Sequence, residues 1–150
     1  MGLSYETTQP FRLIGSKTTA GVTTGVTLES TYQTESDTVA TKSFKIAGYS
    51  KANFDITYTM GATETTNSVE IKLEHSPDNI NWYRYVTDTT TGGTSTLALR
   101  EWTYVGVNAA ASSFSLPVDI FDRYIRVSLK ETGVATNKGK AYVEVTLLGE

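Results

Sequence analysis

The chain has 150 residues, of which 39% are hydrophobic and 19% are charged, and its formal net charge is −3. This length allows one domain with one core, and the apolar fraction is too high for a disordered chain. The 13 Lys and Arg residues are scattered without a basic cluster, which argues against a nucleic-acid-binding protein.

The first 36 residues differ from the rest because they are rich in Thr and Gly and poor in apolar residues. We predict an extended N-terminal arm at 1–36, followed by a single sandwich domain at 37–150. The arm is either a loose terminus or a segment that adds a strand to the sheet edge of a neighbouring chain. In the second case, the residues that contact the partner are Phe11, Leu13, Val26 and Leu28.

From residue 39 onward, short segments with strand-like patterns follow one another. Their apolar residues occupy every second position, which is the period of a half-buried strand. The clearest segments are 53–60, 68–76, 113–120, 123–130 and 140–148, and a further strand is expected at 94–107. Pro117 places its strand at a sheet edge or a bulge. The strand spacing and the lack of a helical period beyond about two turns predict an all-β protein, an antiparallel two-sheet β-sandwich that is jelly-roll-like.

The segment 68–83 predicts a β-hairpin, because an alternating strand is followed by turn-forming residues and then by aromatic residues. Proline fixes φ at a turn position, Asp bonds to nearby backbone, and Asn tolerates a positive φ. The predicted turn residues are Ser76, Pro77, Asp78, Asn79 and Asn81. We expect four residues of this hairpin and of a later strand in the core, namely Leu73, Trp82, Ile125 and Val127.

Aromatic residues are frequent in the second half of the predicted hairpin and in the strand after it. One face of each strand must enter the core, and aromatic residues on the other face contact a partner protein, stack against sugars, or pack under a loop or the N-terminal arm. The sequence does not separate these uses. The candidate partner-binding residues in these strands are Tyr83, Tyr85, Trp102 and Tyr104.

The sequence has few groups that could carry chemistry. His75 is the only histidine, cysteine is absent, and no Gly-x-Ser-x-Gly nucleophile motif is present. No His pair, EF-hand loop or glycine-rich phosphate loop is found. We therefore predict that the protein is not an enzyme and has no catalytic residue, metal ion or cofactor.

The N-terminal residues lack a basic segment followed by an apolar one, so no secretory signal peptide is predicted. No apolar run reaches the roughly 18 residues of a membrane-spanning helix. We expect a soluble protein that is made in a cytoplasm and has neither nucleic acid nor a membrane as a partner.

Two short motifs resemble those of known β-sandwich proteins. The segment 76–82, Ser-Pro-Asp-Asn-Ile-Asn-Trp, resembles a Ser-x-Asp-Gly-x-Asn-Trp hairpin, with Asn79 in place of the usual Gly. The segment 122–127, Asp-Arg-Tyr-Ile-Arg-Val, resembles the Arg-Tyr-Ile-Arg strand that follows in the same proteins. Two groups share these motifs: the decoration or auxiliary proteins of tailed-phage capsids, and the discoidin-like carbohydrate-binding modules of secreted proteins.

The resemblance implies a capsid decoration protein of a tailed phage that stabilises the mature shell by binding across subunit junctions. Its partners would be the major capsid protein and further copies of itself, as a homotrimer, and its location would be the virion, after synthesis in the host cytoplasm. A discoidin-like module that binds surface glycans and a β-sandwich component of a phage tail or baseplate remain the alternatives.

Overall fold

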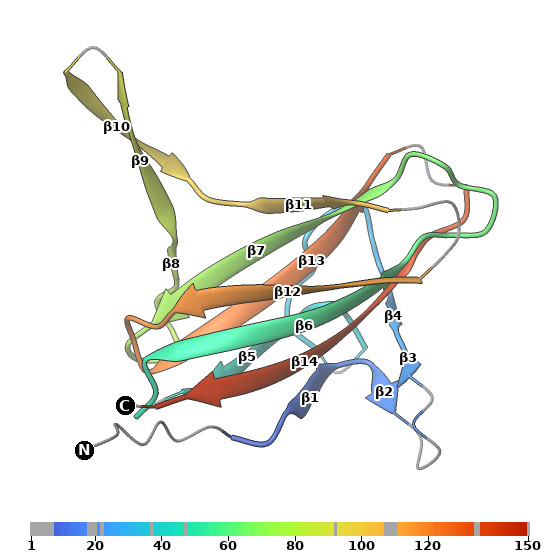
Figure 1. Ribbon diagram of the computed structural model, residues 1–150, viewed down its shortest axis with the longest axis horizontal. Helices are drawn as coiled ribbons and strands as arrows, with labels where there is room; N and C mark the ends of the chain where they lie inside the picture. Colours follow the sequence, from blue (N-terminus) through green and yellow to red (C-terminus); the bar gives the residue numbers. More distant parts are fainter. Residues whose placement is uncertain are drawn as a thin grey trace, which may run out of the picture.

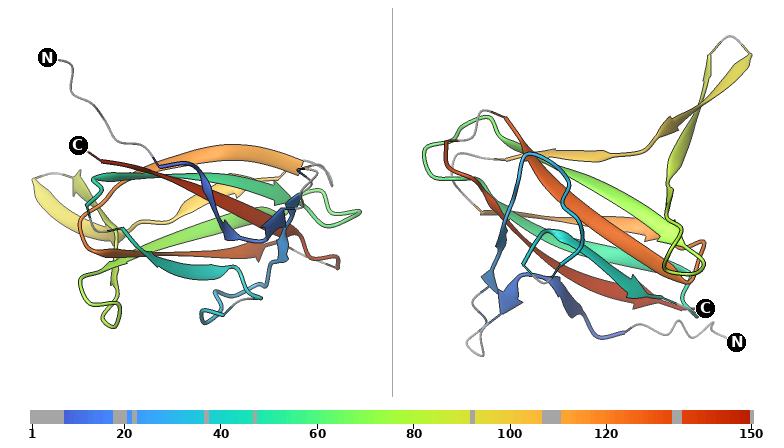
Figure 2. Two further views of the ribbon diagram at one scale, coloured as in Figure 1. Left: turned by 90° about the horizontal axis from the view of Figure 1, so that it is seen from below. Right: turned by 180° about the vertical axis from the view of Figure 1, so that it is seen from behind.

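The computed structural model describes residues 8–17, 21, 23–36, 38–46, 48–91, 93–106, 111–133 and 136–149, and all of their regular secondary structure is β-strand. Two antiparallel sheets lie face to face, as the layers in Figure 2 show. The first sheet has the strand order β1 (Phe11–Ile14), β14 (Lys140–Leu148), β6 (Lys51–Thr59) and β12 (Ala111–Asp119), and β4 (Val26–Thr27) also pairs with β14.

The second sheet faces the first and contributes the other half of the core (Figure 1). Its strand order is β11 (Trp102–Val105), β7 (Ser68–Ser76), β13 (Tyr124–Thr132) and β5 (Thr41–Lys45), and β8 (Tyr83–Arg84) also pairs with β7. Two further pairs stand outside these sheets, namely β2 (Ser16–Lys17) with β3 (Thr23–Thr24), and β9 (Val86–Thr91) with β10 (Thr94–Leu99).

The order of the eight main strands is that of a jelly roll. When β1, β5, β6, β7, β11, β12, β13 and β14 are counted from one to eight, the two sheets have the orders 1-8-3-6 and 5-4-7-2. This arrangement of two Greek keys is the jelly-roll topology. The predicted fold class, an antiparallel two-sheet sandwich, is therefore confirmed.

The core lies between the sheets and follows the alternation of their strands. In β6 the even-numbered residues point inward and are fully buried, as Phe54 and Tyr58 illustrate. The predicted core residues Leu73, Ile125 and Val127 are also fully buried. Pro117 lies in β12, which among the described strands pairs only with β6 and forms the edge of its sheet, as expected for a residue without a backbone N–H.

The prediction that Trp82 is a core residue is wrong. Trp82 lies before β8 on the outer side of the second sheet, where the guanidinium group of Arg126 is 4.2 Å from the ring centroid. Tyr85 is buried in its place. The two-residue period gives the alternation of faces, but the irregular backbone between the turn and β8 decides which residue enters the core.

The described residues of the predicted N-terminal arm belong to the sandwich. The strand β1 pairs with β14, and the ring of Phe11 lies 5.5 Å from that of Phe44 in the second sheet. Leu28 is fully buried, and its backbone N–H donates to the carbonyl of Gly139. The boundary expected near residue 36 is therefore corrected: residues 8–17 and 23–36 lie against their own chain, and 1–7 fall outside the described residues.

A buried carboxylate joins the two sheets at one end of the sandwich. Glu131 is 3% exposed and accepts hydrogen bonds from the Tyr58 hydroxyl (2.5 Å), the Asn67 side-chain amide (3.2 Å) and the Gly139 backbone N–H (2.8 Å). Burial and the hydrogen bond to Glu131 raise the pKa of Tyr58 well above its usual range. Three donors compensate for the loss of hydration around the buried carboxylate.

Candidate interaction surface

A two-stranded hairpin projects from the sandwich. The strands β9 and β10 pair with each other and with no other strand of the described chain, and the hairpin stands away from both sheets (Figures 1 and 2). Its register places Val86 opposite Leu99 and Asp88 opposite Leu97. Because opposite residues, and residues two apart, share a face of a strand pair, one face of the hairpin carries Val86, Leu97 and Leu99. These three side chains are 49%, 69% and 61% exposed.

The foot of the hairpin is held to the sandwich by polar contacts. The backbone N–H of Arg100 donates to the carbonyl of Tyr85 at 2.8 Å, and the guanidinium group of Arg84 contacts the carboxylate of Glu101 at 2.5 Å. The hydroxyl of the buried Tyr85 donates to the backbone carbonyl of Asp119 at 2.9 Å. Burial, together with the nearby Asp122 and Asp119 carboxylates, raises the pKa of Tyr85 to about 12. The hairpin therefore leaves the sandwich from a fixed base.

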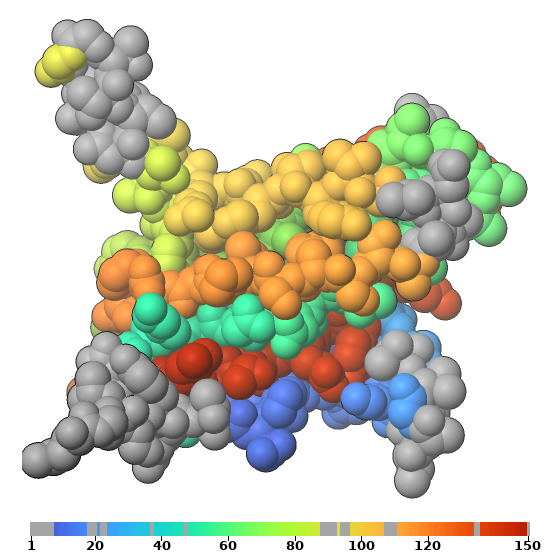
Figure 3. Space-filling view, viewed as in Figure 1, coloured from blue at the N-terminus to red at the C-terminus, as the bar shows by residue number. Residues whose placement is uncertain are grey.

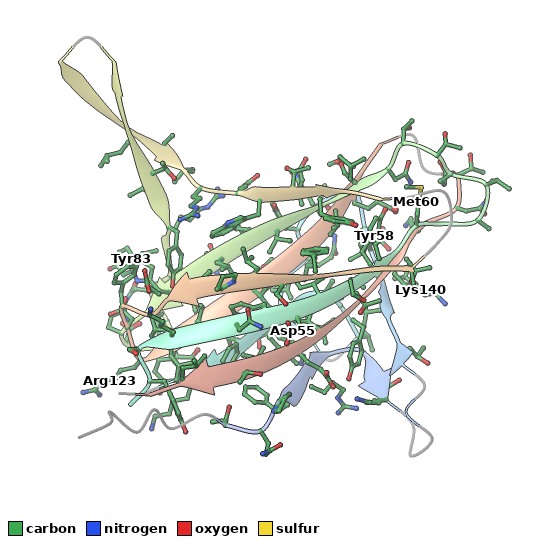
Figure 4. The ribbon with its side chains drawn as sticks, in the orientation of Figure 1. Asp55, Tyr58, Met60, Tyr83, Arg123 and Lys140 are labelled. Atoms are coloured by element: carbon green, nitrogen blue, oxygen red, sulfur yellow. The ribbon has the colours of Figure 1, made fainter. Side chains whose placement is uncertain are left out.

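Aromatic rings gather beside this base. The His75 ring centroid lies 6.0 Å from that of Tyr83, 5.2 Å from that of Tyr85 and 6.2 Å from that of Phe121. Its Nδ1 also forms a hydrogen bond with a carboxylate oxygen of Asp122. Tyr83 and Phe121 are the exposed members, at 54% and 70%. Tyr83 lies at the foot of the hairpin, at the opposite end of the sandwich from Tyr58 (Figure 4).

A shallow groove of about 280 Å³ runs between the hairpin base and the strand β12. It is lined by Tyr85, Val86, Arg100, Trp102, Pro117, Val118, Asp119 and Phe121. The guanidinium group of Arg100 lies 4.7 Å from the ring centroid of Trp102, and neither Arg100 nor Asp119 makes an ion pair within the described chain. The groove thus presents one unpaired cation and one unpaired carboxylate beside apolar side chains.

We call this region the hairpin-foot surface. Its apolar members are Tyr83, Val86, Leu97, Leu99 and Phe121, and its charged members are Arg100 and Asp119. In the space-filling view, the yellow surface of β11 and of the hairpin base continues along one side of the molecule (Figure 3). Seven large hydrophobic side chains of the described residues are exposed, and five of them belong to this surface. Such a concentration of exposed apolar groups is typical of a protein contact.

The structure separates the four aromatic residues predicted to face a partner. Tyr83 is exposed, whereas Tyr85 is buried in the core. Trp102 and Tyr104 are partly buried and pack against the core, and the Tyr104 ring stacks on that of Phe114 with centroids 4.2 Å apart. Of these four residues only Tyr83 therefore faces outward: Tyr85 is buried between β8 and β9, and β11 turns the rings of Trp102 and Tyr104 toward the core.

Several contact candidates were not predicted from the sequence. Phe121 lies two residues after the end of β12, and the alternation of that strand gave no indication of its exposed position. The segment expected as one strand at 94–107 is two strands, β10 and β11, separated at Arg100 and Glu101. The direction in which the hairpin projects depends on contacts that are distant in sequence.

The predicted turn after β7 is present. Residues 77–81 are exposed, and Asn79 has a φ of 62°. The Asp78 carboxylate accepts backbone hydrogen bonds from Ile80 (2.9 Å) and Asn81 (2.8 Å) and one from the Asn81 side chain (2.7 Å), which hold its pKa below the usual range. Ser76 is fully buried, and its hydroxyl accepts from the Asn79 N–H at 2.9 Å. These contacts explain why this sequence forms the turn.

The outer face of the second sheet forms a second concave region, which is polar. Its pocket is lined by Tyr32, Gln33, Thr34, Glu35, Thr41, Lys72, Arg126 and Ser128. The ammonium groups of Lys72 and Lys130 lie 4.9 and 4.8 Å from the Tyr32 ring centroid, and Arg126 bonds to Glu74 at 2.8 Å. Cations therefore already contact Tyr32 and Glu74, and the Glu35 carboxylate accepts hydrogen bonds from Ser43.

The described residues contain no group of three or more His, Cys, Asp or Glu side chains that could hold a metal ion. Within the same part of the chain, no helix is long and apolar enough to cross a membrane.

Comparison with known proteins adds no relative. No family model matches the sequence, and no curated protein is significantly similar to it. The fold and the hairpin-foot surface are therefore the features that bear on the function.

Proposed function

We propose that the protein is a non-enzymatic structural component of a virion, a decoration protein that binds the shell of a tailed phage. The observation that carries this proposal is the hairpin-foot surface, where a projecting hairpin and a group of exposed apolar side chains form a surface suited to protein contacts. The jelly roll is compatible with it, because viral capsid proteins use this fold, although lectins and cupins use it too.

The proposed mechanism is mass action. A protein that binds the assembled shell but not its dissociated subunits stabilises the shell by its binding free energy. Many copies, each with a modest interface, then add up to a large effect. This mechanism requires no catalytic group, and it requires rigid surfaces, which a sandwich with paired strands provides.

Purified virus particles provide the test. Quantitative mass spectrometry should find the protein at a copy number comparable with that of the shell protein, and imaging should place it on the outer surface of the shell. Particles that lack it should lose their genome at a lower temperature, and adding the purified protein should restore the stability. A few copies at the tail would instead assign it to the tail or baseplate, and its absence from particles would refute the proposal.

The carbohydrate-binding alternative has less support from the geometry. A sugar-stacking site needs a free aromatic face, but the rings of Tyr32, Trp82 and Trp102 each carry a cation within 5 Å of the centroid. Tyr83 and Phe121 are exposed, yet they adjoin the apolar hairpin. Binding of the isolated protein to a glycan array, lost in Tyr83→Ala, would favour the alternative.

A further inference from the structure

We infer that the hairpin-foot surface is the contact between two copies of this chain, paired about a two-fold axis. The inference rests on the proposed function in taking this surface as a protein contact of a virion component, and it names a second copy of the chain as the partner there. The sequence analysis predicted a contact through the N-terminal arm and, from the resemblance, a homotrimer. The inference instead places the self-contact at the hairpin-foot surface and gives it two-fold symmetry.

The hairpin has no third strand as a partner within the described part of its own chain. A two-stranded hairpin by itself is marginally stable in water. In the described part of the chain the hairpin pairs with no third strand, and the side chains of Val86, Leu97 and Leu99 on one of its faces are exposed. Covering this face with another apolar surface would remove it from water. At the foot, Phe121 lines the same groove as Val86 and is 70% exposed.

The charges make the surface complementary to itself. Arg100 and Asp119 line the same groove, and each lacks an ion-pair partner in the described chain. In a two-fold contact, residue i of one copy meets residue j of the other, and j meets i. The Arg100 of each copy would then face the Asp119 of the other, while the apolar side chains between them pack together. A strongly charged partner would leave one of these two groups facing a like charge.

The test is a charge exchange measured by sedimentation equilibrium of the full chain over a wide range of concentration. The wild-type protein should form a dimer. Arg100→Asp alone and Asp119→Arg alone should each raise the dissociation constant by about tenfold or more, because like charges then meet twice across the axis. Two combinations should restore the dimer: the double variant, and an equimolar mixture of the two single variants, in which opposite charges face each other again.

Lys45→Asp is the matched control, because it makes a similar change of charge at an exposed position in β5, at the other edge of the second sheet. It should leave the dissociation constant unchanged, and circular dichroism with urea unfolding should show that every variant is folded. A monomer at the highest concentration, a trimer, or single variants that the charge exchange does not rescue would overturn the inference. A protein that is monomeric in solution but present in virions would refute the dimer and leave the proposed function standing. A dimer that is absent from virus particles would refute the proposed function and leave the dimer standing.

Discussion

The strand β6 and the β9–β10 hairpin both carry apolar side chains on one face, but their surroundings differ. The strand β6 has a hydrogen-bonded neighbour on each side and a facing sheet, whereas β9 and β10 pair only with each other in the described part of the chain. Phe54 in β6 is fully buried, and Leu97 in the hairpin is 69% exposed. The alternation specifies that one face is apolar, and the pairing of distant strands decides whether that face becomes core or remains a contact surface.

The largest effect on the sandwich is expected from Phe54→Ala. Phe54 is fully buried between the sheets, and its ring lies 6.1 Å from that of Phe44. Removing such a ring should lower the free energy of unfolding by about 3–5 kcal/mol, through lost apolar burial and the cavity left behind. Urea unfolding followed by tryptophan fluorescence measures this change. A loss below about 1 kcal/mol would contradict the position of β6 at the centre of the core.

High pH should weaken the attachment of the hairpin to the sandwich. The pKa of Tyr85 is raised from 10.0 to about 12, so Tyr85 contributes fully to stability below pH 10, where both the folded and the unfolded states hold the proton. Between pH 10 and about 12 the Tyr85 hydroxyl loses its proton in the unfolded chain but keeps it in the folded protein. The free energy of unfolding should therefore fall by up to about 3 kcal/mol over this range.

Urea unfolding as a function of pH tests this expectation. Tyr85→Phe should reduce the fall in stability above pH 10, and the exposed Tyr83 offers a matched control as Tyr83→Phe. A pH dependence that is the same in Tyr85→Phe and in the wild type would show that Tyr85 is not buried as described.

A smaller loss is expected from Trp82→Ala. Because the ring lies on the outside of the second sheet and stacks on Arg126, the variant should lose about 1 kcal/mol, the value of a partly exposed cation–π contact and its packing. The core position predicted from the sequence would instead give about 3–5 kcal/mol. Arg126→Ala in the wild type and in Trp82→Ala completes a double-mutant cycle, and a coupling energy near zero would argue against the stacked contact.

The smallest effect should come from Leu97→Ser in the hairpin. This side chain is 69% exposed, so the free energy of unfolding should change by less than about 0.5 kcal/mol when measured at a low protein concentration. Leu73→Ser, at a fully buried position in β7, is the contrasting substitution and should be strongly destabilising. Similar losses at the two positions would mean that the hairpin packs against its own sandwich.

The sequence predicted the sandwich more reliably than its contact surface, for a physical reason. The strict alternation in β6 and β12 and the turn at Asp78 and Asn79 depend on residues close in sequence, and these predictions are confirmed. Whether Trp82 or Tyr85 enters the core depends on how β8 pairs with β7, which is a contact between strands. The projecting hairpin and the exposed Phe121 likewise depend on strand pairing, and the periodicity within one segment does not predict which strands pair.

The buried Glu131 restricts how this sequence can evolve. A Cβ at position 139 would lie 2.6 Å from Glu131 Oε1 and 2.7 Å from the carbonyl oxygen of Thr59, so no side chain fits at Gly139. A change of Glu131 alone would remove one of these obstacles and leave the backbone of β6 as the other. Position 139 should therefore stay glycine in related chains even where Glu131 is replaced, and a natural sequence with a larger residue there should show a different course of the loop that leads into β14.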